Sequence, residues 1–455
     1  MDTDVIVIGA GAAGLAAATT ARRAGRRVTL VSAGPPGGDC TFTGCVPSKT
    51  LLAAAARGLP FDAALQRVRT TVGRIAAAED EQALRRDGIE VVRGHARLLG
   101  GTAVEADGHR VRARQVVLAT GARPSVPPIP GLESVPYLTT DTVFELTAKP
   151  ASLAILGAGP VGCELAQAFA RLGVPVSLIE AADRILPGFE PEAAEILAEA
   201  LRAAGVRLHT ATSITDAEVE GDLVRLGLDG EPLRAHRLLV AVGRSPETTG
   251  LDLDAAGVRI DAGGFVVVDR HLAATAPGVY AAGDVTGLFG HTHAAYAMGR
   301  VAVVNGARRR RQLAFDPAAI PRVVFTDPEI AIVGTDEHAA AVDGARVAYL
   351  PMAEVDRAIT AGRETGFVKL VAGPRRLIGH TGGGRVLGAT IVAQRAGEMI
   401  HEPVLAMQTG MFAGRLAQAV HAYPTWSIAV QQAAAQFVGT YGGRTARPVC
   451  APDQD

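Results

Sequence analysis

The chain begins with a short apolar segment that runs into the glycine turn Gly9-Ala10-Gly11-Ala12-Ala13-Gly14. The pattern around this turn predicts a strand over 4–8, a helix over 14–23 and a second strand over 27–32. In such a β-α-β unit the glycines permit a tight turn, and backbone N–H groups can approach a pyrophosphate at the helix N-terminus. We therefore predict a dinucleotide site at these three glycines.

The same pattern recurs in the second quarter of the chain. Gly157-Ala158-Gly159-Pro160-Val161-Gly162 lies between a predicted strand at 152–156 and a predicted helix from Cys163. The next predicted strand, 176–179, ends at Glu180. One such motif alone is a weak signal, but two in the right context predict two separate dinucleotide sites.

Two cysteines follow the first unit, in Gly37-Gly38-Asp39-Cys40-Thr41-Phe42-Thr43-Gly44-Cys45-Val46-Pro47-Ser48-Lys49. Five positions along a regular helix advance about 7.5 Å, whereas disulfides rarely tolerate Cα separations beyond about 7 Å. If Cys40 and Cys45 pair, the first turn of the helix must be distorted, which Gly44 and Pro47 permit. The alternative is two buried free cysteines, but the surrounding glycines, proline and lysine favour a redox-capable pair.

The composition describes a long chain of ordinary polarity: 455 residues, 48% hydrophobic and 20% charged, with a formal net charge of −1. This length predicts about two to four domains. The balanced charge gives no electrostatic reason to expect nucleic acid or an anionic membrane as a partner. No apolar run reaches membrane-spanning length, and the acidic start does not fit a signal peptide.

Cysteine and lysine are both sparse. Cysteine occurs only at 40, 45, 163 and 450, which is too few for a secreted disulfide scaffold and fits a reducing compartment. We therefore expect a cytoplasmic protein. Lysine occurs only at 49, 149 and 369, so 42 of the 45 basic residues are arginine.

Beyond the two glycine turns, the pattern predicts a helical pair over 50–87 and a Pro-rich linker at 124–130. From about 316 a separate α+β domain is predicted, with strands at 322–325, 366–371 and 386–392 and helices at 396–412 and 425–438. The last segment, 439–455, is rich in Gly, Pro and charge and is predicted to be a loose tail.

Together these motifs resemble the class I FAD-dependent pyridine nucleotide–disulfide oxidoreductases, with the mercuric reductase and dihydrolipoamide dehydrogenase branch the most similar. The resemblance covers nearly the whole chain. It rests on the two glycine turns, the cysteine stretch at 37–49, A-T-G-x-x-P at 119–124, G-R-x-P at 243–246, A-G-D at 282–284 and F-T-D-P-E at 325–329. It implies an α/β fold with two Rossmann-like dinucleotide-binding domains, for FAD and NAD(P), and a C-terminal α+β dimerisation domain.

The resemblance also implies a homodimer and a set of domain boundaries. The FAD-binding domain would comprise 1–146 and 271–315, the NAD(P)-binding domain 147–270, the dimerisation domain 316–440 and a flexible tail 441–455. The residues expected to bind FAD or NAD(P)H are Gly9, Gly11, Gly14, Ser32, Gly38, Lys49, Thr120, Gly121, Gly157, Gly159, Gly162, Glu180, Gly243, Gly283 and Asp284.

The resemblance also implies a path for electrons. Hydride passes from NAD(P)H to FAD, and electrons then reach the Cys40–Cys45 disulfide. Cys45 is implied to be the flavin-proximal thiolate and Cys40 the sulfur that attacks an acceptor. A helix N-terminus near Cys45 and the cation of Lys49 both favour thiolate over thiol. Family analogy pairs Lys49 with Glu164; the alternative is an ordinary first-turn acid stabilised by the helix dipole.

Three further positions concern the binding of FAD and NAD(P)H. Asp284 is implied to bond the ribityl chain of FAD; the alternative is a turn aspartate after glycine. The family usually carries an acid at the FAD ribose, where this chain has Ser32, whose hydroxyl can still form a hydrogen bond. Glu180 stands where an acid accepts hydrogen bonds from an adenosine ribose and repels a 2′-phosphate. We therefore expect NADH, with Arg184 as the residue that would admit NADPH.

The C-terminal region departs from the family. Members that act on dithiols carry H-x-H-P-T-x-S-E, in which the second histidine relays the substrate proton across the dimer and the glutamate orients it. Here the stretch is His421-Ala422-Tyr423-Pro424-Thr425-Trp426-Ser427-Ile428, with Tyr423 at the relay position and Ile428 at the orienting one. A phenol with a reference pKa of about 10 is a poor general base at neutral pH. His421 lies off the relay position without an evident carboxylate partner, so we expect a structural histidine rather than a substitute relay.

The absence of the relay histidine and of the orienting glutamate argues against efficient turnover of dihydrolipoamide or glutathione. The tyrosine, like the stretch 159–169, resembles mercuric reductases, which deliver the metal through a vicinal cysteine pair near the C-terminus. This chain has only Cys450 there, which we expect to be incidental, and we expect Cys163 to be a small packing residue. We predict an FAD-dependent NAD(P)H oxidoreductase with a non-dithiol acceptor: Hg(II), Cu(II), a quinone or an unusual disulfide. The alternatives are a dihydrolipoamide dehydrogenase-like disulfide reductase and a non-catalytic redox-sensing flavoprotein dimer.

Overall fold

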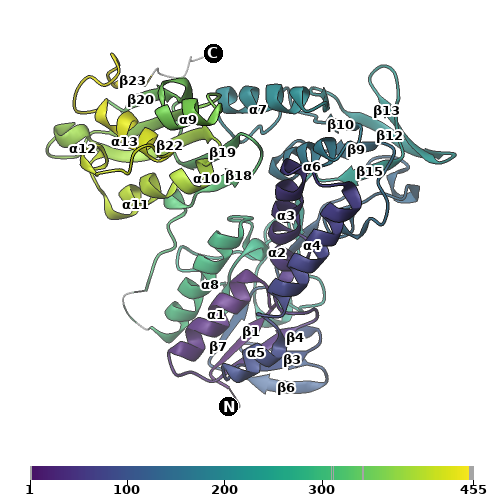
Figure 1. Cartoon of the computed structure of the whole chain (residues 1–455). Helices are drawn as coiled ribbons and strands as arrows, with labels where there is room; N and C mark the ends of the chain where they lie inside the picture. Colours follow the sequence, from purple (N-terminus) through teal and green to yellow (C-terminus); the bar gives the residue numbers. More distant parts are fainter. Residues whose placement is uncertain (1–2, 309, 311, 341–342, 450–455) are drawn as a thin grey trace. The chain divides into compact units, whose positions relative to one another are not determined.

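Figure 1 shows the computed structural model of the chain, in which residues 3–308, 310, 312–340 and 343–449 are described. The chain divides into two compact units. Unit 1 combines Met1–Pro150 with Arg237–Asp316, and unit 2 combines Ala151–His236 with Pro317–Asp455. Each unit is therefore assembled from two separated segments of the chain.

Unit 1 contains the first glycine turn and the cysteine pair. Its strands are β1 (Val5–Ile8), β2 (Val28–Ser32), β3 (Glu90–Arg93), β4 (Ala96–Gly100), β5 (Ala103–Ala106), β6 (His109–Arg112), β7 (Gln115–Leu118), β8 (Ala122–Pro124), β15 (Arg237–Val240), β16 (Arg244–Pro246) and β17 (Val279–Ala281). Its helices are α1 (Ala12–Arg23), α2 (Gly38–Phe42), α3 (Cys45–Ala56), α4 (Phe61–Ala76), α5 (Glu81–Arg86) and α8 (Thr292–Ala307).

A five-stranded parallel sheet in the order β17-β7-β1-β2-β3 forms the centre of unit 1. Strand β1 is buried along its whole length, as an apolar run in a parallel sheet predicts. Val5 and Val7 pack in the core with α1 and α8, which lie side by side (Figure 1). Ile6 and Ile8 pack on the opposite face with residues of the antiparallel sheet β4-β5-β6. The glycine turn after β1 is thus held between two cores.

Unit 2 contains the second glycine turn and the C-terminal sheet. Its strands are β9 (Leu153–Leu156), β10 (Val176–Ile179), β11 (Arg207–His209), β12 (Ile214–Glu220), β13 (Leu223–Leu228), β14 (Leu233–Ala235), β18 (Arg322–Val324), β19 (Glu329–Gly334), β20 (Arg346–Pro351), β21 (Phe367–Gly373), β22 (Arg385–Ala393) and β23 (Arg447–Pro448). Its helices are α6 (Pro160–Arg171), α7 (Pro191–Ala203), α9 (Asp356–Ala361), α10 (Ala396–Met399), α11 (His401–Thr409), α12 (Ala413–Gln418) and α13 (Ile428–Ala435).

Two kinds of sheet occur in unit 2. Strand β10 pairs in parallel with β9 and β11, which is the arrangement of a Rossmann-like unit. The C-terminal sheet is antiparallel, in the order β18-β19-β22-β21-β20-β23. Residues of α10, α11, α12 and α13 pack with this sheet in one apolar core. The predicted α+β character of the C-terminal region is confirmed.

Several predicted elements have different limits in the structure. Helix α6 begins at Pro160 rather than Cys163, because proline is favoured in the first turn of a helix. The helical pair predicted over 50–87 is three helices, α3, α4 and α5, and Gly58 with a φ of +68° follows the first. The helix predicted over 396–412 is divided into α10 and α11, where Pro403 lacks the N–H that would continue the ladder.

The C-terminal segment up to residue 449 also differs from the predicted loose tail. Arg447 and Pro448 form β23, which pairs with β20 at the edge of the sheet, and Arg447 forms an ion pair with Glu337. Gly- and Pro-rich composition concealed this pairing, because the partner strand lies far away in the sequence. The rest of the predicted tail, including Cys450, lies outside the described residues. Within the described ranges, no helix is both long and apolar enough to cross a bilayer.

Candidate functional site

The first glycine turn brings backbone segments into close contact. A β-carbon on Gly9, whose φ is +105°, would lie 2.2 Å from the carbonyl oxygen of Ala119, and one on Gly14 would lie 1.8 Å from that of Gly9. A β-carbon on Gly38 would lie 2.7 Å from the Cα of Gly11. Only glycine fits such positions, and the start of α1 carries no side-chain cap. The turn therefore fits the pyrophosphate of the expected FAD, which needs exposed backbone donors.

Other residues expected at FAD lie around this turn. Ser32 ends β2, is buried, and donates a hydrogen bond to the carbonyl oxygen of Gly34 (2.9 Å), so its oxygen can still accept one from a ribose hydroxyl. Gly283 has a φ of +81°, and a β-carbon on it would lie 3.0 Å from the Cβ of Ala13 in α1. The A-G-D turn therefore packs against the first glycine turn, as its expected role requires.

The motifs A-T-G-x-x-P and G-R-x-P lie together in unit 1. They form the antiparallel pair β8–β16, and the hydroxyl of Thr120 donates to the carbonyl oxygen of Glu247 (2.6 Å). Gly121 and Gly243 both have positive φ, +77° and +142°, and a β-carbon on either would meet no atom within 4 Å. Glycine is therefore favoured at these two positions by the backbone conformation and not by close packing.

The second glycine turn repeats the geometry of the first. Gly157 has a φ of +100°, and a β-carbon on Gly162 would lie 1.9 Å from the carbonyl oxygen of Gly157. Helix α6 follows Gly159, which provides no side-chain cap. The same close approach of helix and strand occurs at both turns, so both fit a dinucleotide pyrophosphate.

Glu180 lies directly against this second turn. Its Oε2 accepts a hydrogen bond from the backbone N–H of Ala158 (2.8 Å), and its Oε1 accepts one from that of Ala182 (3.0 Å). Arg184 donates to the carbonyl oxygen of Leu186 (2.9 Å) and to that of the following proline (3.0 Å). The carboxylate is therefore fixed beside the pyrophosphate turn, and the guanidinium is engaged with its own loop.

The two cysteines of the predicted redox pair lie on separate short helices. Cys40 belongs to α2, and Cys45 is the first residue of α3. The expected distortion is confirmed at Thr43 and Gly44, where the backbone leaves helical geometry (φ −132°, ψ −4° and φ −116°, ψ −108°). A β-carbon on Gly44 would lie 2.9 Å from the carbonyl oxygen of Asp39, so glycine permits the break.

A hydroxyl group from α8 contacts the pair. The Oγ1 of Thr292 lies 3.2 Å from the Sγ of Cys45. The pKa of Cys40 is raised, first by its hydrogen bond to Cys45, then by burial and by the charge of Cys45. In the reduced pair Cys40 therefore keeps its proton, while Cys45 lies at the starts of α3 and α8, where helix dipoles favour an anion. Thr292 was missed in the sequence, since no motif links it to a cysteine 247 positions away.

Arg244 is a second residue that sequence reasoning did not assign to the site. Its Nη2 forms an ion pair with Asp39, beside Cys40, and also donates to the carbonyl oxygen of Ala122. Its Nε lies 3.4 Å from Oδ2 of Asp284. Burial raises the pKa of Asp284, Arg244 offsets part of this effect, and Asp39 adds to it. The guanidinium thus connects the redox segment with the A-G-D turn; the bond from Asp284 to the ribityl chain stays a prediction.

Tyr423 has a carboxylate partner. Its side chain is 69% exposed, and its hydroxyl donates to Oδ2 of Asp356 at the start of α9 (2.7 Å). This hydrogen bond and the charge of Asp356 raise the pKa of the Tyr423 phenol above its ordinary value. The phenol is therefore an even poorer base at neutral pH than its residue type suggests.

His421 has the carboxylate partner that the sequence did not reveal, which corrects our expectation. Its Nε2 lies 2.9 Å from Oε2 of Glu402 in the first turn of α11, and its Nδ1 lies 3.0 Å from the carbonyl oxygen of Ala419. The histidine side chain is only 7% exposed. With both ring nitrogens engaged, His421 anchors the segment that carries Tyr423, which fits the expected structural role.

The remaining predicted residues lie on two helices. Lys49 follows Cys45 by one turn of α3, and its pairing with Glu164 stays a prediction. Glu164 is buried on α6, and its Oε1 accepts a hydrogen bond from the backbone N–H of Phe325 (3.0 Å). Cys163 is fully buried with its Sγ 3.3 Å from the carbonyl oxygen of Ala158, and burial raises the pKa of its thiol. Its role as a packing residue is confirmed.

No group of three or more His, Cys, Asp or Glu side chains forms a metal site in the part of the chain that the structure describes. Soft cations such as Hg(II) and Cu(I) favour thiolate ligands.

Comparison with known protein families agrees with this arrangement. Residues 3–299 match the family described as pyridine nucleotide-disulphide oxidoreductase. Residues 320–434 match the dimerisation domain of the same group of proteins. The second match indicates a homodimer.

Individual relatives cover nearly the whole chain. A mercuric reductase of Streptomyces lividans is 36% identical over 95% of this chain and 96% of its own length. A dihydrolipoyl dehydrogenase of Chlamydia muridarum is 32% identical over 93% of this chain and 94% of its own. The mercuric reductase of Acidithiobacillus ferrooxidans reaches 38% identity over 95% of this chain and 82% of its own length.

Among solved structures, LpdA from Mycobacterium tuberculosis has a TM-score of 0.87 at 30% identity, covering 95% of this chain and 99% of its own. The Cu(II) complex of the HOCl-induced flavoprotein disulfide reductase RclA from Escherichia coli also has a TM-score of 0.87, at 28% identity. It covers 96% of this chain and 99% of its own. The predicted fold class is confirmed by these similarities.

Proposed function

Because the chain belongs to the pyridine nucleotide-disulphide oxidoreductase family, we propose that it is an NADH:acceptor oxidoreductase that passes electrons through Cys40 and Cys45 to a non-dithiol acceptor. FAD is the cofactor of this family. A soft or reducible metal ion, Hg(II) or Cu(II), is the leading acceptor class, and a quinone is the second. The mercuric reductases among the relatives and the Cu(II) complex of RclA support the metal ion.

The thiol chemistry balances as follows for each turnover. Bound FAD would be held at the first glycine turn and would supply the chemistry that carries a hydride equivalent from NADH to the disulfide. The S–S bond breaks as it gains the two electrons and the one proton of that hydride, which leaves a thiol on Cys40 and a thiolate on Cys45. Reoxidation re-forms the S–S bond and releases the proton of Cys40. The two electrons reduce one Hg(II) to Hg(0), two Cu(II) to Cu(I), or one quinone, which also takes up two protons.

The observation that carries the choice of acceptor is the hydrogen bond from Tyr423 to Asp356. A dithiol substrate must lose protons to a base, and the raised pKa of the Tyr423 phenol keeps it protonated near neutral pH. Ile428 stands where the orienting glutamate of dithiol-using relatives would be, and it packs against the core of unit 2. A metal ion that accepts electrons from thiolates needs no such base.

The choice of NADH rests on Glu180. Both of its oxygens accept backbone hydrogen bonds beside the second glycine turn, a position suited to a ribose diol and repulsive to a 2′-phosphate. Arg184, the nearby cation that could favour NADPH, is hydrogen-bonded to carbonyl oxygens of its own loop. We therefore expect kcat/KM to be higher for NADH than for NADPH.

An anaerobic titration with NADH, followed by a screen of Hg(II), Cu(II), quinones and disulfides as oxidants, tests the proposal. NADH should bleach the flavin and produce thiolate–flavin charge-transfer absorbance, and Cys45→Ser should abolish that absorbance and metal reduction. Unchanged metal or quinone reduction in Cys45→Ser would show that the thiols are not on the path. Failure of NADH to bleach the flavin would favour a non-catalytic sensor instead.

A second assay addresses the dihydrolipoamide dehydrogenase-like alternative. The similarity to a dihydrolipoyl dehydrogenase, at 32% identity, supports this alternative. With dihydrolipoamide and NAD as substrates, we expect turnover at least about a hundredfold below typical enzymes, because loss of general-base catalysis costs roughly 10²–10⁴ in rate. Turnover within the usual range of such enzymes would refute our interpretation of Tyr423.

A further inference from the structure

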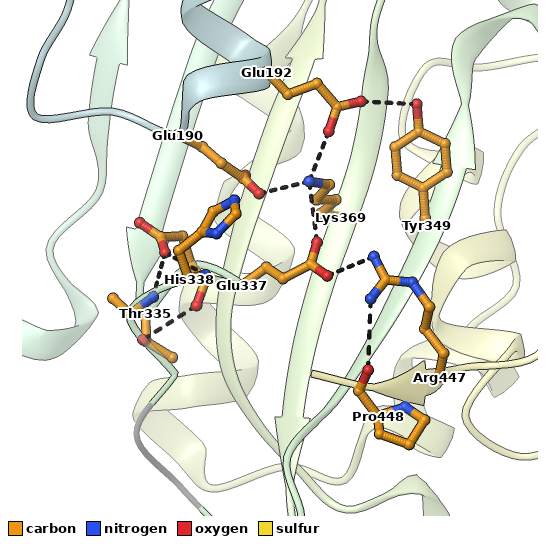
Figure 2. A network of polar contacts seen from close by, with 11 residues as sticks. Glu190, Glu192, Thr335, Glu337, His338, Tyr349, Lys369, Arg447 and Pro448 are labelled. Atoms are coloured by element: carbon orange, nitrogen blue, oxygen red, sulfur yellow. Dashed lines mark hydrogen bonds and ion pairs between the residues drawn. The ribbon is translucent and has the colours of Figure 1, made fainter. Parts of the chain in front are cut away.

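Lys369 lies at the centre of a buried charge network in unit 2 (Figure 2). Its ammonium nitrogen lies 2.6 Å from Oε1 of Glu190, 2.7 Å from Oε2 of Glu192 and 3.2 Å from Oε2 of Glu337. The lysine side chain is 7% exposed and that of Glu190 is fully buried. Buried ion pairs often contribute little net stability relative to apolar packing, which favours a positional role for this network.

The network requires lysine rather than arginine. An ammonium group has three N–H donors in divergent directions, and here the three neighbours are three different carboxylates. A guanidinium is planar, and its fork suits two oxygens of one carboxylate. The chain carries lysine at only three positions and arginine at 42, so a lysine at position 369 is an exception to the composition of the chain.

Glu190 depends on Lys369 for its charge compensation. Its Oε1 accepts the 2.6 Å hydrogen bond from the lysine, while its buried Oε2 has no hydrogen-bond partner. Lys369 is thus the single cation that pairs with Glu190 among the residues described. Glu192 differs, since it is 41% exposed and also accepts a hydrogen bond from Tyr349 (3.1 Å). Loss of the lysine would therefore act most strongly at Glu190.

Glu190 closes the loop that starts at the expected ribose-binding residue. The loop runs from Glu180, at the end of β10, to Glu190, directly before α7. Midway, the backbone N–H of Leu186 donates to the carbonyl oxygen of Ala158 in the second glycine turn (2.9 Å). Leu186 has a φ of +47°, a left-handed conformation that costs free energy for a residue with a side chain. Such strain persists only where the surrounding structure fixes it.

We propose that Lys369 is a positioning residue for the nicotinamide coenzyme: by holding Glu190, it fixes the loop 181–189 against the second glycine turn and so orients Glu180 toward the adenosine ribose. The C-terminal sheet, through β21, thereby determines coenzyme affinity in a neighbouring Rossmann-like segment of the same unit. This inference rests on the proposed use of NADH at Glu180.

Two readouts on the full-length holoenzyme test the proposal, with Lys369→Met as the main variant. Hydrogen exchange of the 181–189 amides, measured without coenzyme, should become about tenfold faster because the anchored loop opens more often. The KM for NADH should rise about threefold or more while kcat stays within about twofold, because uniform binding is lost.

Glu337→Gln is the matched control, because it disturbs the same network at the contacts of Glu337 with Lys369 and Arg447 and leaves the contact between Lys369 and Glu190 intact. It should lower the melting temperature without changing exchange at 181–189 or the KM. If Lys369→Met fails to fold, Glu190→Gln removes the loop anchor without leaving a buried unpaired charge, and it should shift exchange and KM in the same direction.

The outcomes separate this inference from the proposed function. Equal effects of Lys369→Met and Glu337→Gln on loop exchange, or no effect of either, would overturn the positioning role. Faster loop exchange together with a wild-type flavin that NADH cannot reduce would support the anchoring of the loop, while overturning the coenzyme assignment and the proposed function.

Discussion

At the residue scale, the thiol pair is governed by groups that lie far away in sequence. Thr292 Oγ1 and the starts of α3 and α8 meet at Cys45, whereas the pKa of Cys40 is raised by its neighbour and by burial. The two sulfurs are therefore chemically unequal before any acceptor arrives. This asymmetry fits a pair in which one sulfur stabilises negative charge and the other carries the proton.

We predict that Thr292→Val makes the reduced Cys45 less reactive at neutral pH. A hydrogen bond to a charged group contributes roughly 1.5–3 kcal/mol, and one pH unit corresponds to about 1.36 kcal/mol. The pH midpoint of Cys45 alkylation by iodoacetamide, followed by mass spectrometry, should rise by about one unit. Thr50→Val is the control, because the Thr50 hydroxyl donates to the carbonyl oxygen of Val46 on α3 (2.7 Å). An unchanged midpoint in Thr292→Val would exclude this role.

Glu329 supports a prediction about pH and stability. Burial raises its pKa from 4.5 to about 7, despite the hydrogen bond that its Oε2 accepts from the N–H of Gly397 (2.9 Å). A folded-state pKa above the unfolded one gives stability that is fully present below about pH 4.5 and is lost as the pH rises through about 7. Glu329→Gln should therefore be more stable than wild type at pH 8, by up to roughly 3 kcal/mol.

Thermal unfolding from pH 4 to pH 8 measures this effect. The curves for wild type and Glu329→Gln should converge at the acidic end and separate toward pH 8. Glu364→Gln, at an exposed position of the same unit, should follow wild type throughout. A constant gap between the curves of Glu329→Gln and wild type across the range would contradict the titration.

At the element scale, the break between α2 and α3 is the device that makes a disulfide feasible. In a continuous helix the axial rise alone would hold the two Cα atoms at least about 7.5 Å apart, beyond the usual limit of about 7 Å for a disulfide. Thr43 and Gly44 interrupt the helix; Gly44 was predicted to permit this break, whereas Pro47 lies within the first turn of α3.

We predict that Gly44→Ala slows formation of the Cys40–Cys45 disulfide by about tenfold, because the added methyl group pushes α2 away from α3. The β-carbon would lie 2.9 Å from the carbonyl oxygen of Asp39 and 3.5 Å from the Cα of Cys40. Thiol counting during air oxidation gives the rate. Gly34→Ala, where an added β-carbon meets no atom within 4 Å, should oxidise like wild type. Equal rates for both variants and wild type would show that the break tolerates a side chain.

The elements that sequence could predict are those whose signal is local. Both glycine turns, the cysteine pair and the packing role of Cys163 depend on neighbours along the chain. Thr292, Asp356 and Glu402 were missed because each meets its partner through tertiary structure, across 247, 67 and 19 positions respectively. Strand β23 was missed for the same reason.

At the scale of the whole molecule, the dimerisation domain exposes apolar side chains around the segment that carries Tyr423. Val420 is 99% exposed and Leu405 is 55% exposed. Both belong to the region that matches the family's dimerisation domain. Because both lie in that domain, we infer that a second copy of the chain covers them.

We predict that Val420→Glu weakens the homodimer by at least about tenfold in Kd, since a charge at an apolar contact costs on the order of 1.4 kcal/mol or more. Light scattering coupled to size exclusion, over a dilution series, measures the dissociation. Leu377→Glu is the control, because Leu377 is 93% exposed on the loop between β21 and β22, outside the segment 420–428. Dissociation of both variants alike, or of neither, would contradict this location of the interface.

The buried Lys369 has a consequence for how this sequence can drift over generations. A single base change can convert a lysine codon into an arginine codon, and arginine outnumbers lysine 42 to 3 in this chain. At Lys369 the same substitution would put a planar fork where three carboxylates approach from three directions. We therefore expect selection to retain lysine at position 369 in natural variants of the gene, even in variants whose other lysines are replaced by arginine.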